Sequence, residues 1–421
     1  MRLILSLAAI ASTLSFSPDS LCVNIEDATP YIRPEFRPMA RMLTLSPEFT
    51  PTCGNTFQLI TQGNVYGDML FQDLRDAREL IELELFLFCD DSDGNRVRDL
   101  LFQKADEGVE VRYTHDAFGN MFDSIFDGRP IFRGYYAEMS RRGIKKAEYA
   151  PLWGLDPTYV TPGVRNHRKI NIIDRKIAYA GGMNISEGSI SGWGDAMLRI
   201  QGPAVDCLRA IFLRNWNSSV CAKDKVKKKI SVSPSGPPEG KIMQAVADGA
   251  DVPSHTTEDI IVWVLDNARD YVWFQTPYFL PNRPVLKAFK RAADRGVDVR
   301  VLIPIESDLP ALDPAYHTSF KTCTQSGVKL IYLKPPFNHS KTFVCDDYLV
   351  FVGSSNIDKL SLKRAYEVNT LIYDEQTARQ QKSRLEEAQE GSTLIGQDLF
   401  DTWTGSEYFK QALFTLISPW L

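Results

Sequence analysis

The stretch NHRKINIID at residues 166–174 returns as NHSKTFVCD at residues 338–346, so both copies read His-x-Lys-x4-Asp. The match continues without a gap, because a glycine, an asparagine and an acid follow each histidine at 14, 17 and 28 positions. These residues are Gly181, Asn184 and Asp195 in the first copy, and Gly353, Asn356 and Glu367 in the second. At average residue frequencies, a chance repeat of the five offsets has a probability of about 10⁻⁵. We therefore interpret the chain as a duplication.

The duplication extends to the elements that precede each motif. Hydrophobic periodicity predicts a helix, a strand, a helix and a strand, at residues 68–78, 80–88, 95–107 and 109–113. The same order returns at residues 260–269, 271–276, 284–295 and 297–301. Gly108 and Gly296 follow the second helix of each set, where glycine commonly ends a helix. Helices that alternate with short strands predict an α/β fold of two repeated lobes, with a sheet covered by helices.

The composition is typical of a globular protein, with 421 residues of which 44% are hydrophobic and 24% charged. We expect a signal-like segment, an N-terminal extension, a first lobe, a Lys/Pro-rich linker and a second lobe, at residues 1–17, 18–55, 56–216, 217–240 and 241–421. The net charge of −5 disfavours a dedicated nucleic-acid binder, which usually carries a basic excess. Seven scattered cysteines without CxxC spacing predict neither a zinc site nor a disulfide framework.

Two segments bear on localisation. Arg2 precedes a short apolar run over residues 3–16, which is a signal-peptide pattern and too short to span a bilayer comfortably. We expect a membrane-associated protein, exported or held at the cell envelope by this segment, and a buried N-terminal helix is the alternative. The linker carries five lysines between residues 223 and 229. We interpret them as a solvated charge run, with contact to anionic lipid or nucleic acid as the alternative.

Each motif is expected on a β-hairpin. The strand pairs 169–173 with 176–180 and 342–345 with 348–352 flank turns at Asp174 and Asp346. Residues two apart on a strand share a face, so the histidine and lysine of each motif project together. The aspartate has the opposite parity and falls at the turn. We therefore expect both aspartates to brace the hairpin or a neighbouring cation rather than touch a substrate.

Two histidines, two lysines and two asparagines brought together form a site for a phosphodiester. The set is His167, Lys169, Asn184, His339, Lys341 and Asn356, with Asp195 and Glu367 beside it. Lysines neutralise the non-bridging oxygens and asparagines donate hydrogen bonds to them. One imidazole can attack phosphorus, and the other can protonate the leaving alkoxide.

The two acids fit the role of fixing the tautomer of each histidine and favouring its cationic form. This chemistry requires neither a cofactor nor a metal. Each lobe supplies only half of the set, so we expect the site at the interface between the lobes.

These motifs resemble the phospholipase D superfamily, whose signature is a doubled His-x-Lys-x4-Asp followed by glycine and asparagine. The resemblance covers about residues 60–421, and within the superfamily it is strongest to bacterial cardiolipin synthases. The segments that carry it are residues 166–169, 181–185, 198–205, 276–279, 293–300, 353–358, 366–369 and 418–421. The chain departs from the family in carrying one short apolar segment where two membrane helices are usual. It also has Gly182 where the second copy has Ser354.

The resemblance implies two pseudo-twofold-related α/β/α lobes with the active site at their interface. It also implies a phosphatidyltransferase that makes cardiolipin and glycerol from two phosphatidylglycerol molecules through a phosphohistidine. By analogy, His167 is the nucleophile and His339 the acid. The implied partners are an anionic phospholipid and a membrane surface. A hydrolase that transfers the same group to water is the alternative, and a nuclease of the superfamily is less favoured because of the acidic balance. A non-catalytic scaffold is disfavoured because both motifs are intact.

Overall fold

The computed structural model describes residues 23–25, 27–117, 119, 133–149, 164–227, 230–232, 240–252, 255–305 and 313–396. In the first half, seven strands build the sheet: β2 (Thr52–Ile60), β3 (Leu80–Leu85), β4 (Glu110–Asp116), β5 (Lys145–Tyr149), β6 (Ile170–Ile173), β7 (Ile177–Gly181) and β8 (Met197–Gln201). The longer helices of this half are α2 (Gly63–Asp76), α3 (Ser92–Asp106), α5 (Arg133–Arg141) and α6 (Ala204–Ser219).

The second half repeats this arrangement of strands and helices. Its sheet strands are β10 (Lys241–Asp248), β11 (Tyr271–Gln275), β13 (Asp298–Pro304), β14 (Lys329–Leu333), β15 (Thr342–Cys345), β16 (Leu349–Gly353), β18 (Glu367–Tyr373) and β19 (Thr393–Leu394). The helices are α7 (Thr256–Asn267), α8 (Arg283–Asp294), α9 (Asp313–Gln325), α10 (Lys359–Lys363) and α11 (Glu375–Gln389). The strands β12 (Phe279–Leu280) and β17 (Ile357–Asp358) form a separate pair.

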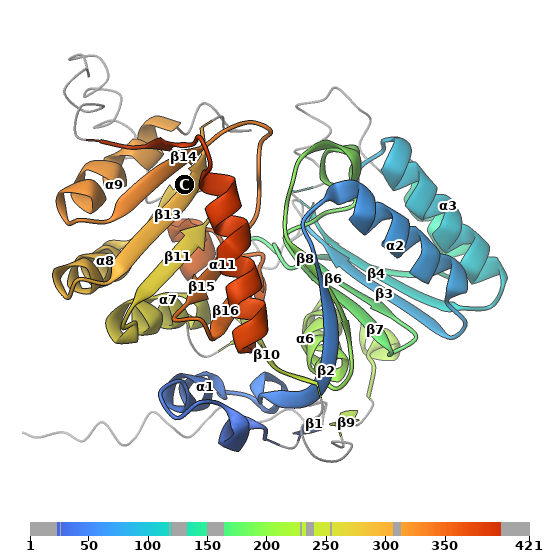
Figure 1. The fold of residues 1–421 in the computed structure, drawn as a ribbon. Helices are drawn as coiled ribbons and strands as arrows, with labels where there is room; N and C mark the ends of the chain where they lie inside the picture. Colours follow the sequence, from blue (N-terminus) through green and yellow to red (C-terminus); the bar gives the residue numbers. More distant parts are fainter. Residues whose placement is uncertain are drawn as a thin grey trace, which may run out of the picture.

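The two halves share one sheet of 15 strands, in the order β19-β14-β13-β11-β15-β16-β18-β10-β2-β8-β7-β6-β3-β4-β5. Read outward from the antiparallel contact of β10 with β2, both halves follow the same strand connectivity. Figure 1 shows the two halves side by side, with α2 and α3 outside one and α7, α8 and α9 outside the other. The predicted α/β fold of two related lobes is confirmed.

The hairpin turns explain why each motif ends in aspartate. Asp174 and Arg175 have φ angles of 50° and 57°, and Asp346 and Asp347 have 47° and 48°. Positive φ at both central residues is typical of a type I′ turn, and each turn is closed by a backbone hydrogen bond, from the Lys176 N–H to Ile173 and from the Tyr348 N–H to Cys345. Aspartate tolerates this conformation better than most residues. The β6–β7 and β15–β16 hairpins are therefore specified locally.

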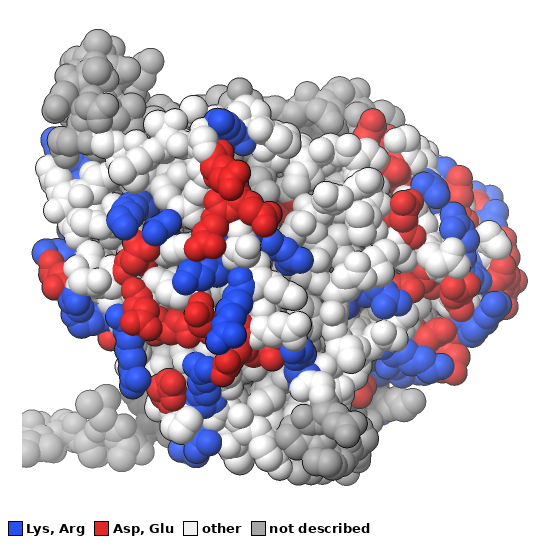
Figure 2. Space-filling model, viewed as in Figure 1, with Lys and Arg blue, Asp and Glu red and all other residues white. Residues whose placement is uncertain are grey.

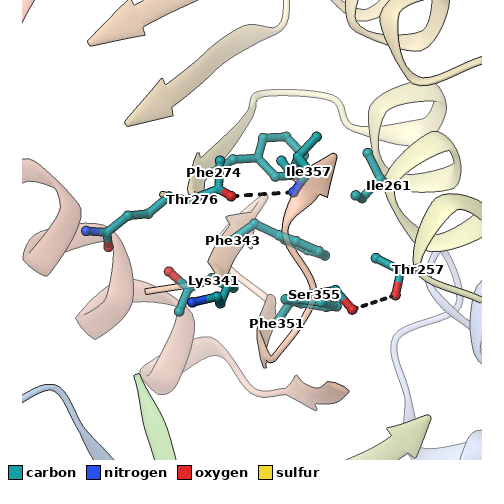
Figure 3. A pocket seen from close by; sticks show the side chains of 11 residues that line it. Thr257, Ile261, Phe274, Thr276, Lys341, Phe343, Phe351, Ser355 and Ile357 are labelled. Carbon is teal, nitrogen blue, oxygen red and sulfur yellow. Dashed lines mark hydrogen bonds between the residues drawn. The ribbon is translucent and has the colours of Figure 1, made fainter. Parts of the chain in front are cut away.

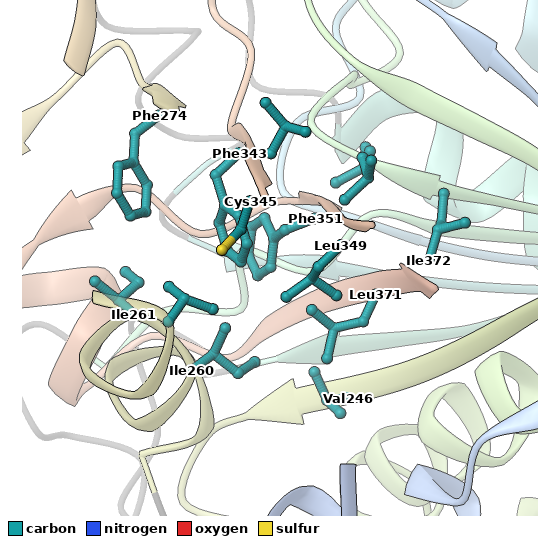
Figure 4. Packing of buried hydrophobic residues seen from close by; sticks show 14 of the residues in the cluster. Val246, Ile260, Ile261, Phe274, Phe343, Cys345, Leu349, Phe351, Leu371 and Ile372 are labelled. Carbon is teal, nitrogen blue, oxygen red and sulfur yellow. The ribbon is translucent and has the colours of Figure 1, made fainter. Parts of the chain in front are cut away.

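Aromatic and aliphatic side chains hold the second hairpin in place. Phe343 of β15 and Phe351 of β16 stack with ring centroids 4.9 Å apart, and Phe274 of β11 lies 5.3 Å from Phe343. Figure 4 shows these rings packing beside Ile260 and Ile261 of α7. Burial of a side chain of this size contributes about 1.5–3 kcal/mol. The strand that follows His339 is therefore fixed by the core.

Residues 27–50, predicted as part of an extension without sustained periodicity, form short helical turns that pack on the body. They contain η1 (Thr29–Tyr31), α1 (Arg37–Leu43) and η2 (Pro47–Phe49). Ile32, Met39 and Phe49 are buried. In the predicted linker, β9 (Ile230–Val232) pairs in parallel with β1 (Val23–Ile25). Lys228, Lys229 and residues 233–239 lie outside the described residues, as do residues 397–421.

The predicted localisation is wrong. Among the described ranges, no helix combines the length and the apolar character needed to cross a bilayer. The signal-like segment at residues 1–17, on which that prediction depended, lies outside the described residues.

Candidate active site

Each histidine motif is fastened to the segment that carries the acid of the other half. The backbone of Asn166 forms a parallel bridge with Tyr366, and the His167 N–H donates to the Tyr366 carbonyl at 2.8 Å. In the related place, Asn338 bridges Gly194 and the His339 N–H donates to its carbonyl at 2.7 Å. Both motifs therefore meet where the halves join.

The acids pair with the histidines across the halves. His167 Nδ1 lies 3.0 Å from Glu367 Oε2, and His339 Nδ1 lies 2.8 Å from Asp195 Oδ2. Both carboxylates are fully buried. A carboxylate on Nδ1 fixes the proton there and leaves Nε2 as the reactive nitrogen. The sequence predicted acids for the imidazoles, and the structure adds that each comes from the opposite half.

Both motif lysines are buried beside their histidines. Lys169 Nζ donates to the His167 carbonyl at 2.8 Å. Lys341 Nζ donates to the His339 carbonyl and lies 2.6 Å from His339 Nδ1 and 3.7 Å from Asp195 Oδ2. Figure 3 shows Lys341 on the wall of a small cavity, whose far side carries Ser355 hydrogen-bonded to Thr257 at 3.0 Å. Each motif lysine thus contacts the main chain of its own histidine.

Burial and neighbouring charges set the protonation of the site. Burial lowers the pKa of His167 to about 4, against the opposing charge of Glu367, and Lys169 and Lys341 lower it further. Burial likewise lowers the pKa of Lys169 to about 7, with Lys341 adding to the effect. Burial raises the pKa of Glu367, but His167 and Lys169 outweigh it and hold that pKa below its usual value. His167 is therefore neutral, and Glu367 anionic, at neutral pH. Because Lys341 acts on His167 and Lys169, the two motifs share one electrostatic environment.

The two asparagines lie in related places after the hairpins. Asn184 and Asn356 are each 5% exposed. Asn184 Oδ1 accepts a hydrogen bond from the Leu87 N–H at 3.2 Å, which leaves its amide nitrogen for another acceptor. Such an amide can donate to a phosphate oxygen.

The missing hydroxyl of the first half has a steric explanation. In the second half, Ser354 Oγ donates a hydrogen bond to Glu367. In the first half, a Cβ added at Gly182 would lie 2.7 Å from the Asp195 Cγ, so a serine there would require the Asp195 carboxylate to shift. Asp195 accepts from its own neighbour instead, the Ala196 N–H at 2.7 Å. The two halves therefore hold their acids in different ways.

Four partly buried aromatic rings surround the histidines, and the sequence reasoning did not identify them. The Phe86 ring lies 5.1 Å from His167. The rings of Tyr278, Phe337 and Trp193 lie 5.9, 5.9 and 6.3 Å from His339. Two signals were available, because Phe86 lies near the end of the strand predicted over residues 80–88 and Phe337 directly precedes the second motif. The entrance to the site is thus largely apolar.

The motif aspartates lie at the hairpin turns, away from the histidines. The Asp174 carboxylate accepts hydrogen bonds from the backbone N–H groups of Arg78, Glu79 and Leu80, at 2.7–2.9 Å. The Asp346 carboxylate accepts from the corresponding Arg269, Asp270 and Tyr271, at 2.8–3.0 Å. Each aspartate therefore ties its turn to the start of the neighbouring strand, β3 or β11.

Known proteins share both the sequence and the fold. A family model described as "Cardiolipin synthase, PLD-like domain" matches residues 70–216 and 261–388. Cardiolipin synthase 1 of Staphylococcus epidermidis is 31% identical over 389 residues, which cover 91% of this chain and 78% of that protein. Cardiolipin synthase 1 of Staphylococcus aureus is 32% identical over 390 residues, covering 90% and 77%.

The fold has a solved relative. The crystal structure of phosphatidylserine synthase from Haemophilus influenzae matches with a TM-score of 0.69 at 12% identity, covering 92% of this chain and 98% of that one. At this identity the likeness concerns the fold alone. The sequence matches confirm the resemblance seen in the doubled motif. The chain belongs to the cardiolipin synthase family of phospholipase D-like proteins.

Proposed function

We propose that the protein is a phosphatidyltransferase that joins two phosphatidylglycerol molecules into cardiolipin and releases glycerol. The observation that carries the proposal is the crossed pairing of His167 with Glu367 and of His339 with Asp195. The pairing places a carboxylate on the Nδ1 atom of each imidazole, so that both Nε2 atoms lie on the side away from the acids. The cardiolipin synthases of the two staphylococci support the choice of substrate.

In the first step, His167 Nε2 attacks the phosphorus of one phosphatidylglycerol. The bond from phosphorus to the glycerol oxygen breaks, and His339 gives that oxygen the proton from its Nε2. The phosphorylated His167 is a cation, which the Glu367 carboxylate stabilises. Lys169 and Lys341 neutralise the charge on the non-bridging oxygens.

In the second step, a head-group hydroxyl of the other phosphatidylglycerol gives its proton to His339. Its oxygen attacks the phosphorus, the phosphorus–nitrogen bond breaks, and cardiolipin leaves with His167 neutral again. Both histidines thus return to their starting protonation after one turnover, and no further reactant is consumed.

The surroundings of the histidines support a lipid at a membrane surface as the substrate. Rings such as Phe86, Trp193 and Tyr278 match the glycerol ester region of a phospholipid better than a nucleic-acid backbone. On the face drawn in Figure 2, lysine and arginine are interspersed with aspartate and glutamate, and no broad basic band follows the surface. A nuclease usually presents such a band.

The test uses the purified full chain with phosphatidylglycerol vesicles labelled in the head-group glycerol. We expect one cardiolipin for each glycerol released, with neither product from His167→Ala. His255 is exposed and lies outside both motifs, so His255→Ala is the matched control and should keep wild-type activity. Phosphatidic acid as the sole product would replace the proposal with a hydrolase. Metal-independent cleavage of plasmid DNA without lipid turnover would replace it with a nuclease.

A further inference from the structure

Arg168, the residue between the histidine and lysine of the first motif, points away from both into the second half of the chain. Its side chain is completely buried. Residues adjacent on an extended segment face opposite ways, so Arg168 does not share the substrate face of His167 and Lys169. A buried guanidinium therefore lies directly behind the proposed nucleophile, His167.

Within the part of the chain that the structure describes, every hydrogen-bond acceptor of the Arg168 side chain belongs to the second half. Its Nε donates to the Glu367 carbonyl at 3.1 Å, and one terminal nitrogen donates to the Asp248 carbonyl at 2.7 Å. The Asp251 carboxylate accepts from both terminal nitrogens, at 2.9 and 3.1 Å. Asp248 and Glu367 face each other in the β10–β18 register. The guanidinium therefore clamps the ends of two neighbouring strands, one of which carries the acid of His167.

The Arg168 contact completes a closed loop of interactions around the nucleophile. The Glu367 side chain is held by His167 and by Ser354, and its main chain is held by Arg168. Arg168 is covalently next to His167. His167, through its peptide bond, and Glu367, through its carbonyl, are thus both attached to Arg168. Neither residue can therefore shift without the other.

The second motif has no such clamp. Its corresponding residue is Ser340, which is too short to reach across the halves. The acid on that side, Asp195, instead accepts a hydrogen bond from the adjacent Ala196 N–H, and Lys341 of the other half approaches it at 3.7 Å. The clamp therefore serves only the histidine that, under the proposed function, carries the phosphatidyl group.

We propose that Arg168 is a positioning residue that keeps the Glu367 carboxylate aligned with His167 Nδ1 through both steps of the reaction. This inference rests on the proposed function. It predicts that Arg168 acts through Glu367 and has little effect of its own once that carboxylate is gone.

The test is a double-mutant cycle on the full chain, with turnover measured on phosphatidylglycerol vesicles. We expect Arg168→Ser and Glu367→Gln each to lower kcat by about 10²-fold with KM changed less than about threefold. The double variant should then be no slower than the slower single variant. Both single variants should move the acid limb of the kcat/KM profile to lower pH, because the Glu367 charge raises the pKa of His167.

A purely structural role would give a different result, because partial unfolding lowers activity by the same factor in both backgrounds. If the losses multiply in the double variant, the inference is overturned. Arg168→Lys repeats the cycle with the charge retained, should Arg168→Ser fail to fold. Arg209, a buried arginine that pairs with Glu82 at 2.7 Å, gives the matched control. The factor by which Arg209→Lys lowers kcat should multiply with the factor for Glu367→Gln in the double variant. Absence of cardiolipin from the wild type would overturn the proposed function instead, which this design keeps separate.

Discussion

His167 and Glu367 are separated by 200 residues in the sequence, and their Nδ1 and Oε2 atoms lie 3.0 Å apart. In the equivalent pair, His339 and Asp195 are separated by 144 residues, and their Nδ1 and Oδ2 atoms lie 2.8 Å apart. Each imidazole therefore forms its hydrogen bond with a carboxylate from the other half. A lobe on its own holds a histidine without its acid, so the reaction depends on the join between the halves.

Substitutions of the two acids should impair different steps of the reaction. Glu367→Gln removes the charge that stabilises the phosphorylated His167, and Asp195→Asn weakens His339 as a proton donor. Both should lower kcat on phosphatidylglycerol by about 10²–10⁴-fold. An aryl phosphatidyl ester has a leaving group that departs as its anion. In the release of the aryl group, which reports the first step alone, the loss in Asp195→Asn should shrink to less than about tenfold, while the loss in Glu367→Gln persists. The opposite pattern would exchange the roles of the two histidines.

The pKa values of His167 and Lys169 predict a bell-shaped pH dependence. His167 must be neutral to attack, so kcat/KM should rise as the pH passes about 4, where the buried imidazole loses its proton. Lys169 must be charged to neutralise the phosphate, so kcat/KM should fall as the pH passes about 7. The profile is measured with a short-chain phosphatidylglycerol in solution. In Lys169→Arg the alkaline limb should move up by more than two pH units, since arginine keeps its proton. An unmoved limb would assign it to another group.

The turn aspartates should affect stability and leave the chemistry unchanged. Asp174→Ala removes three hydrogen bonds from backbone N–H groups, of which two are exposed and one is partly buried. We expect a loss of about 1–3 kcal/mol in the free energy of unfolding, measured by denaturant titration. Asp174→Asn keeps one acceptor and tolerates the positive φ, so its loss should be smaller. A fall of kcat by more than tenfold at unchanged stability would place Asp174 in the site after all.

Much of the fold could be predicted because the determinants are local. The helices and strands before each motif follow from hydrophobic periodicity, and the hairpins follow from turn residues such as Asp174 and Asp346. The crossed acids could not be predicted, because fixed offsets such as those of Asp195 and Glu367 describe one half at a time. The role proposed for Arg168 could not be predicted for the same reason, since its side-chain hydrogen bonds are all long-range.

The N-terminal residues 27–50 illustrate a second limit. Their turns and short helix are too brief to show a 3.6-residue period, and their order comes from burial of residues such as Phe36 and Phe49 against the body. Because no such period is visible there, the sequence predicts an extension in place of these helical turns. Tertiary burial, which no single sequence window contains, decides their conformation.

Gly182 should be as sensitive to substitution as the residues that touch the substrate. Its backbone φ is not in the left-handed region, so alanine strains nothing in the main chain. A Cβ there would lie 2.7 Å from the Asp195 Cγ and must push the carboxylate away from His339. Gly182→Ala should therefore lower kcat on phosphatidylglycerol by about 10²-fold, and the loss should shrink on the aryl ester as it does for Asp195→Asn.

A matched glycine lies nearby. At Gly192 the nearest atom to an added Cβ is the Glu187 carbonyl oxygen at 3.5 Å, an ordinary contact, so Gly192→Ala should keep wild-type activity. If Gly182→Ala also stays within about threefold of the wild type, the carboxylate has room to move without losing His339. The steric account of the missing serine would then be wrong, since Ser354 in the second half would be optional as well.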